Sequence, residues 1–158
     1  GTLPVYLEDA TTPLCGIEAI GEYLEETKSS RMSLIPGDAF ERAEVRRLTG
    51  WFDGKFYAEV SEPVLTEKLI RRFLQRDNGG GGPDTQRVRQ AMAQLRSHLD
   101  YIGHLADHRT WLAGGELSLA DFAAAAHLSA VDYFGDVPWA DFPVATSWYQ
   151  RVLSLIHI

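Results

Sequence analysis

Hydrophobic residues recur at intervals of three or four over most of this chain, which is the spacing of one face of an α-helix. The clearest repeat runs from Asp84 to about Asp107. Its apolar positions are Val88, Met92, Leu95, Leu99, Ile102 and Leu105. We therefore predict one long amphipathic helix in this segment, with its arginines on the opposite face.

A second long helix is predicted to begin at Asp38, because Asp38 and Glu41 have the spacing of a capping box. Its apolar stripe consists of Val45, Leu48, Phe52 and Phe56, widened by Trp51, Tyr57 and Val60. A stripe of this width needs two packing partners. Pro63 has no backbone N–H, so we expect it to kink or interrupt the helix, which then resumes from Leu65 to Leu74.

Two more helices are predicted towards the carboxyl end. Ser118 and Asp121 have the spacing of a second capping box, at the start of the segment LADFAAAAHLSAVDYF. This segment is rich in alanine and apolar nearly all round, which predicts the buried centre of a helical bundle. Pro143 suits the first turn of a final helix, whose inward stripe is Val144, Trp148 and Val152.

The amino-terminal part has the pattern of a β-hairpin followed by a helix. Residues 3–7 and 13–15 have the composition of short strands on either side of a polar turn. The segment IEAIGEYLEE places Ile17, Ile20 and Leu24 at helical spacing. We predict a mostly α protein with a β-β-α region over residues 1–28, a linker over 29–37 and an all-helical bundle over 38–158.

Composition narrows the function classes. Of the 158 residues, 45% are hydrophobic and 11% aromatic, which indicates a folded chain, and no apolar run is long enough to predict a membrane span. The net charge of -7 disfavours binding to nucleic acid, and the basic group Arg71, Arg72 and Arg76 is too short to change that. A single cysteine, Cys15, suits a reducing compartment such as the cytoplasm. Because the chain starts at Gly1 without a methionine, we expect the natural amino terminus to lie upstream.

Two sequence features have some likeness to ligand-binding sites, one for a metal ion and one for phosphate, but we predict neither ligand. His104 and His108, four residues apart, could share a metal ion with Asp100 or Asp107. We identify no further ligand elsewhere, so we interpret them as part of a solvated helix face and predict no metal site. The run NGGGGP at 78–83 is similar to a phosphate-binding loop only in composition, because no strand precedes it and no Gly-Lys-Ser/Thr follows.

The order of these elements, closing on LAGGELSLADFAAAAHL, resembles the glutathione S-transferase superfamily over essentially the whole chain. The resemblance implies a partial thioredoxin-like domain before the helical domain, and it gives Ser118 and Asp121 the role of capping the buried core helix. It also implies a cis proline that helps to bind glutathione, at positions occupied here by Leu3 and Pro4. The residue that activates the glutathione thiol lies before Gly1 in that family, so we predict no catalytic residue in this chain.

In the superfamily, an acidic residue and a serine bind the γ-glutamyl carboxylate of glutathione at a helix N-terminus. Gly16 and Ile17 occupy those two positions here, and a hydrocarbon side chain cannot donate a hydrogen bond. Losing such bonds to a charged group costs about 1.5 to 3 kcal/mol, which weakens a ligand by roughly one to two decades. We therefore predict a vestigial glutathione site and no cofactor.

A narrower resemblance rests on ERAEVRRLTGWFDGKFYAEV and on the segment from Ser97 to Trp139. Both are similar to the FtsZ-localised, glutathione-transferase-like division proteins of alphaproteobacteria. This implies a non-catalytic homodimer that binds FtsZ filaments at the division site. The alternative is a glutathione S-transferase that conjugates glutathione to electrophiles. The final residues, LSLIHI, depart from the resemblance.

Aromatic residues supply the candidates for a contact surface. We interpret Phe52 and Phe56 as bundle core. Other aromatic positions lie off the central stripe or in a turn after the core helix, where they can meet a partner or a second copy of the chain. These candidates are Trp51, Tyr57, Tyr133 and Trp139.

Overall fold

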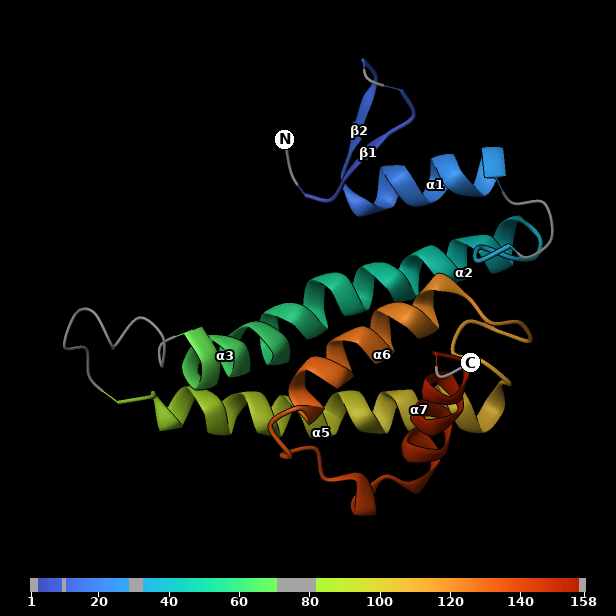
Figure 1. Cartoon of the computed structure of the whole chain (residues 1–158). Coiled ribbons are helices and arrows are strands. Elements are labelled where there is room, and N and C mark those ends of the chain that lie inside the picture. The colour runs from blue at the N-terminus through green and yellow to red at the C-terminus, as the bar shows by residue number, and fades with distance from the viewer. Residues whose placement is uncertain (1–2, 10, 29–32, 71–81, 157–158) are drawn as a thin grey trace. The chain divides into compact units, whose positions relative to one another are not determined.

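The computed structural model describes residues 3–9, 11–28, 33–70 and 82–156. It divides the chain into two compact units, Gly1–Pro36 and Gly37–Ile158. Figure 1 shows a small β-β-α region in blue and a larger set of helices from teal to red. The predicted fold class, mostly α with a small amino-terminal β-β-α region, is confirmed.

The first unit is a hairpin followed by a helix. Strand β1 (Val5–Leu7) pairs antiparallel with β2 (Pro13–Cys15), in a register that places Val5 opposite Cys15. The turn between them is stabilised by the Asp9 carboxylate, which accepts two backbone N–H groups and so supplies local turn bonds. Helix α1 (Ile17–Lys28) follows directly after β2.

The second unit begins with a helix whose winding changes along its length. Helix α2 (Ala39–Gly50) continues into the π-helix η1 (Trp51–Ser61), the short α3 (Glu62–Leu65) and a second π segment, η2 (Thr66–Ile70). The predicted capping box is present at its start. Asp38 accepts the N–H groups of Phe40 and Glu41, and Glu41 reaches back to the Asp38 N–H at 2.8 Å.

Of the two outcomes expected at Pro63, the interruption of the helix is wrong and the kink stays a prediction. Helical structure runs through Pro63, which is buried and lies in the first turn of α3. The N–H of Glu62 donates to the carbonyl of Tyr57, five residues back, so the winding changes from π to α at this point. A proline at the first turn of an α segment does not need the N–H that it lacks. Residues 71–74 of the predicted continuation lie outside the described ranges.

Three helices complete the bundle: α5 (Thr85–His108), α6 (Leu119–Asp132) and α7 (Pro143–Ile156), with the short 3-10 helix η3 (Trp139–Asp141) before α7. Figure 1 shows α6 between α2 and α5. It packs against α2, η1 and α7, so the alanine-rich segment forms the predicted centre. Within the described ranges, no helix combines the length and apolar character that crossing a bilayer requires.

Five fully buried residues of the first long helix lie at a strict interval of four. They are Leu48, Phe52, Phe56, Val60 and Val64. In a uniform α-helix of 3.6 residues per turn, each step of four turns about 40° past the starting face, or about 160° over four steps. A π turn takes more residues than an α turn because its hydrogen bonds span five residues. Mixed winding therefore keeps all five side chains on the core.

Candidate functional site

The four residues of the predicted glutathione site meet at one end of the hairpin. The peptide bond between Leu3 and Pro4 is cis, as the resemblance implies. The Gly16 N–H donates to the Pro4 carbonyl at 3.0 Å, which ties the proline turn to the start of α1. Gly16 has φ of 92°, a conformation that favours glycine. The backbone of this corner is therefore well defined, and Ile17 follows as the first residue of α1.

The side chains of this corner are poorly suited to an anion. Ile17 is 62% exposed and offers only hydrocarbon beside the helix N-terminus. Glu18, in the first turn, already places a negative charge where the helix dipole would attract one from a ligand. The corner keeps the backbone expected of a glutathione site and lacks a side-chain donor at Ile17. That Leu3, Pro4, Gly16 and Ile17 form a vestigial glutathione site stays a prediction.

Three side chains on η1 and α6 have the chemistry of a hydrolase triad. The Ser61 hydroxyl lies 3.0 Å from His127 Nδ1, and the Asp53 carboxylate lies 3.2 Å from His127 Nε2. Ser61 is only 1% exposed, so its oxygen cannot reach a substrate in this conformation. A serine nucleophile also needs an accessible carbonyl and donors for an oxyanion. We therefore interpret this cluster as structural.

A second histidine binds η1 from α5. The His98 ring is 3% exposed, and its Nε2 lies 3.0 Å from Glu59 while its Nδ1 lies 3.3 Å from the indole N–H of Trp51. Phe56 contacts this ring and that of His127, with ring centroids 4.8 Å and 5.8 Å apart. The sequence analysis missed both histidines. Their signal was a histidine at a position where helix periodicity predicts core.

The structure separates the four aromatic surface candidates. Tyr57 on η1 is 46% exposed, and Tyr133 at the end of α6 is 83% exposed. Trp51 is partly buried, with its indole bonded to His98 and its ring 5.3 Å from that of Tyr101. Two of the four are thus open to solvent and a third is engaged within the bundle. Trp51 and Tyr57 lie on η1, and Tyr133 follows the last residue of α6.

Trp139, the fourth candidate, is also engaged within the bundle. Its ring stacks on Tyr149 of α7 at 4.7 Å with an angle of 13° between the planes. Its indole N–H donates to Asp132 at 2.7 Å, which ties η3 to the end of α6. These contacts are those of a staple that closes the bundle.

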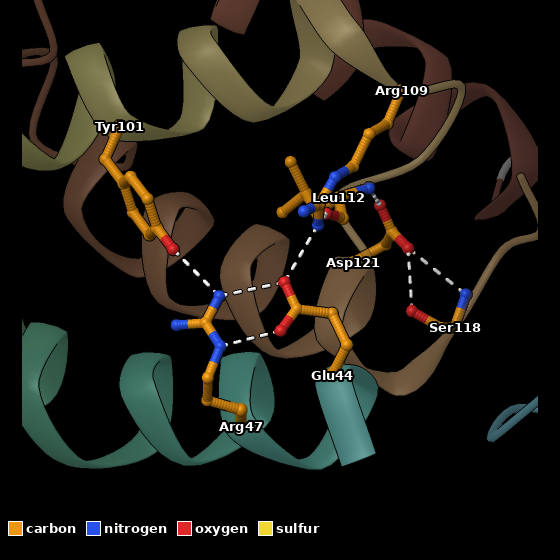
Figure 2. Close-up of polar contacts among 7 residues, drawn as sticks. All are labelled: Glu44, Arg47, Tyr101, Arg109, Leu112, Ser118 and Asp121. Carbon is orange, nitrogen blue, oxygen red and sulfur yellow. Dashed lines mark hydrogen bonds and ion pairs between the residues drawn. The ribbon is translucent and has the colours of Figure 1, made fainter. Parts of the chain in front are cut away.

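The start of α6 is a densely bonded polar centre, and Figure 2 shows it together with Glu44 and Arg47 of α2. Asp121 is 0% exposed and accepts the Ser118 N–H and hydroxyl at 3.1 and 3.0 Å. Its other oxygen accepts the N–H of Leu112 and the indole N–H of Trp148, both at 2.9 Å. One carboxylate therefore joins the α6 N-terminus, the preceding loop and α7.

A second carboxylate lies close to this centre, on α2. Glu44 accepts two hydrogen bonds from Arg47 and one from Arg109, and Arg47 also donates to the Tyr101 hydroxyl (Figure 2). The Arg47 guanidinium, helped by Arg109 and opposed by partial burial, lowers the pKa of Glu44 to about 2. Arg109 donates as well to the Leu112 carbonyl, which links this network to the loop held by Asp121.

His104 and His108, which were interpreted as part of a solvated helix face, line a groove of about 320 Å³ between α5 and the segment from η3 to α7. The rings of His104 and His108 lie 4.6 Å apart, and His108 Nδ1 bonds to the His104 carbonyl. No group of three or more histidine, cysteine or acidic side chains in the described part of the chain is placed to hold a metal ion. The basic group Arg71, Arg72 and Arg76 falls outside the described residues.

Comparison with known proteins gives consistent results. The family described as "Glutathione S-transferase, C-terminal domain" matches residues 62–155. FtsZ-localized protein A of Caulobacter vibrioides (strain NA1000 / CB15N) is 50% identical over 141 residues, which cover 89% of this chain and 60% of that protein. The chain therefore spans less than two thirds of the length of this relative.

Two solved structures are similar over almost the whole chain. A glutathione S-transferase from Rhodospirillum rubrum F11 superimposes with a TM-score of 0.85 at 48% identity, covering 95% of this chain and 65% of that one. FzlA from C. crescentus superimposes with a TM-score of 0.84, also at 48% identity, covering 94% of this chain and 64% of that one. The shared region includes both units of the structure.

Proposed function

The chain belongs to the glutathione S-transferase family through its C-terminal domain, and from that premise we propose that it is a non-catalytic relative that binds FtsZ filaments. In this proposal it acts as a homodimer in the cytoplasm, at the division site, and supports cell division. The observation that carries the proposal is the 50% identity to FtsZ-localized protein A over 89% of the chain.

The geometry of the hairpin corner supports the non-catalytic part of the proposal. Ile17 offers no donor at the start of α1, and Glu18 repels an additional negative charge there. A transferase needs glutathione bound tightly enough to orient its thiol for reaction. A corner with intact backbone and an aliphatic side chain in the donor position fits a scaffold that has been retained for binding another protein.

Co-sedimentation with polymerised FtsZ tests the proposal. The experiment uses the complete product of the gene, because this chain spans 60% of the length of FtsZ-localized protein A. We expect the protein to pellet with FtsZ polymer and to stay in the supernatant with unpolymerised FtsZ. Failure to pellet above background at physiological salt contradicts FtsZ binding.

Substitution of the two exposed aromatic candidates, Tyr57 and Tyr133, tests whether they take part in binding. We expect Tyr57→Ala or Tyr133→Ala to weaken co-sedimentation or dimer formation, because each ring is open to solvent and available to a partner. Gel filtration with light scattering separates the two effects, since it reports the dimer without FtsZ. If both variants pellet and dimerise as the wild-type protein does, these residues lie outside the contact surfaces.

The second candidate function is a glutathione transferase. It is favoured by the cis Leu3–Pro4 turn bonded to Gly16, and by the name of the similar Rhodospirillum rubrum structure. Retention of the complete gene product on immobilised glutathione, followed by conjugation of a standard aromatic electrophile, tests it. Absence of both retention and turnover excludes this function and leaves the FtsZ proposal untouched.

A further inference from the structure

The π-helix η1 has an uncommon winding that packing must hold in place. Most π-helical structure occurs as single turns inside α-helices, frequently at functional sites, whereas η1 runs from Trp51 to Ser61. Its buried side chains Phe52, Phe56 and Val60 explain which face is apolar. Polar contacts from two other helices reach it as well: His98 comes from α5 and His127 from α6.

The hydrogen-bond partners of His98 fix its protonation state. An indole N–H can only donate, so the bond from Trp51 requires a lone pair on His98 Nδ1. The proton of the neutral ring must then lie on Nε2, where it donates to the Glu59 carboxylate at 3.0 Å. Neutral His98 thus satisfies both partners on η1, one at its first residue and one near its end.

We propose that His98 is a proton-sensitive latch on the π-helix, which holds η1 in its present winding when neutral and releases Trp51 when it takes up a proton. Protonated His98 carries N–H groups on both ring nitrogens, so Nδ1 and the Trp51 indole become two donors facing each other. The bond to Glu59 remains and becomes an ion pair between two opposite charges. Protonation therefore breaks the contact at the start of η1 and keeps the one near its end.

His127 provides a comparison within the same structure. Its Nε2 faces the Asp53 carboxylate, and its Nδ1 faces the Ser61 hydroxyl. A hydroxyl can donate to a neutral ring or accept from a charged one by rotating its hydrogen. His127 consequently keeps both partners in either protonation state. The two histidines therefore differ in the partner of Nδ1. At His98 this partner is the Trp51 indole, which can only donate, and at His127 it is the Ser61 hydroxyl, which can donate or accept.

Burial and two charged neighbours shift the pKa of His98. Burial lowers the pKa of His98, while the Glu59 carboxylate opposes that shift and the Lys55 ammonium adds slightly to it. Glu59 and Lys55 both lie on η1. The titratable group that comes near from α6 is His127, whose ring contacts the same Phe56 ring as His98 does. Because the folded state holds this proton less tightly than the unfolded state, the contribution of His98 to stability is present at neutral pH. It is lost as the pH falls through the ordinary histidine range and below.

Release of Trp51 changes an exposed part of the bundle. The Trp51 ring also contacts Tyr101 and lies 5.5 Å from the Lys55 ammonium, so its displacement alters the first turn of η1. Tyr57, the exposed aromatic of the same helix, lies one further turn along. The latch thereby couples proton uptake to the surface that η1 presents. This inference stands independently of FtsZ binding.

Hydrogen exchange on the full chain tests the latch with a matched pair of variants. In His98→Gln, the amide can accept from Trp51 and donate to Glu59 but does not titrate, and His127→Gln is the control. Between about pH 8 and about pH 5, we expect protection of residues 51–61 relative to α7 to fall by about tenfold, the factor expected when one hydrogen bond is lost. The fall is expected in the wild-type protein and in His127→Gln, and it is expected to be absent in His98→Gln.

An NMR titration of the wild-type protein gives a test that does not depend on folding of the variants. We expect the Trp51 indole N–H resonance to move with the same midpoint as the His98 ring carbons. The inference is overturned if His98 titrates without a change at Trp51, or if protection of residues 51–61 is independent of pH. It is also overturned if His98→Gln retains the full pH dependence of the wild-type protein.

Discussion

Replacing Asp121 by alanine is expected to destabilise the second unit far more than replacing Asp38, although both residues belong to capping boxes. Asp38 lies at an exposed helix start, where water can take over its two backbone donors. Losing such a cap costs about 0.5 to 2 kcal/mol. Asp121 is fully buried, and water has no access to its donors.

The magnitude for Asp121 follows from its bonds. In Asp121→Ala, three buried N–H donors lose their acceptor: the backbone groups of Leu112 and Ser118 and the indole of Trp148. Each buried unsatisfied donor costs about 1 to 3 kcal/mol, which gives roughly 3 to 9 kcal/mol in total. A domain of this size has a free energy of unfolding of about 5 to 15 kcal/mol. We therefore expect Asp121→Ala to lose a large part of its free energy of unfolding and to unfold at a much lower urea concentration than the wild-type protein.

Asp121→Asn separates hydrogen bonding from burial. The amide oxygen can still accept from Leu112 and Trp148, but the amide nitrogen cannot accept from the Ser118 N–H, so about 1 to 3 kcal/mol is expected to be lost. Urea unfolding followed by circular dichroism measures all three variants, with equal m-values required for the comparison. If Asp121→Ala lies within about 1 kcal/mol of Asp38→Ala, the network of Figure 2 does not stabilise the fold as argued.

Three further predictions concern other parts of the molecule. Ile17→Ser is expected to raise the affinity for glutathione by about tenfold or more, measured by calorimetry, and an unchanged affinity would show that the corner lacks more than this donor. The pKa of Glu44 is about 2 in the folded state against an ordinary 4.5, so Glu44 should contribute stability at neutral pH that is lost as the pH falls through that interval. In acid unfolding, Glu44→Gln should remove this part of the pH dependence of stability. An unchanged pH dependence contradicts the role given to Glu44. Leu7 is an exposed apolar residue of β1, and Leu7→Lys is expected to reduce self-association of the chain in sedimentation velocity. If the variant and the wild-type chain associate equally, Leu7 does not take part in self-association.

Local patterns in the sequence were sufficient for most of the bundle. The apolar repeat of α5 and the two capping boxes depend on neighbours within one helix, so spacing alone identifies them. The buried position of α6 was also predictable, because a helix that is apolar all round has no face for solvent. The hairpin followed from its polar turn between two apolar segments.

The π winding of η1 was not predicted, and neither were the contacts that His98 of α5 and His127 of α6 make with it, because both depend on packing between helices. The interval of four that links Phe52, Phe56 and Val60 was visible, but it was interpreted as an ordinary helical stripe. Pro63 was expected to kink or interrupt the helix because it lacks a backbone N–H, and the change from π to α winding beside it could not be identified from the sequence. From the sequence alone, Trp139 could close the bundle or lie on a contact surface, and its stacking on Tyr149 depends on a contact between elements that spacing does not reveal.

The mixed winding of the first long helix has a consequence for the length of the chain. A π turn holds one residue more than the same span of α-helix needs, because its backbone bonds reach one residue further. The segment from Trp51 to Ser61 can therefore lose a residue by converting a π turn into an α turn, while the flanking segments keep their positions. We expect a single-residue deletion in this segment to be accommodated without rebuilding the rest of the bundle.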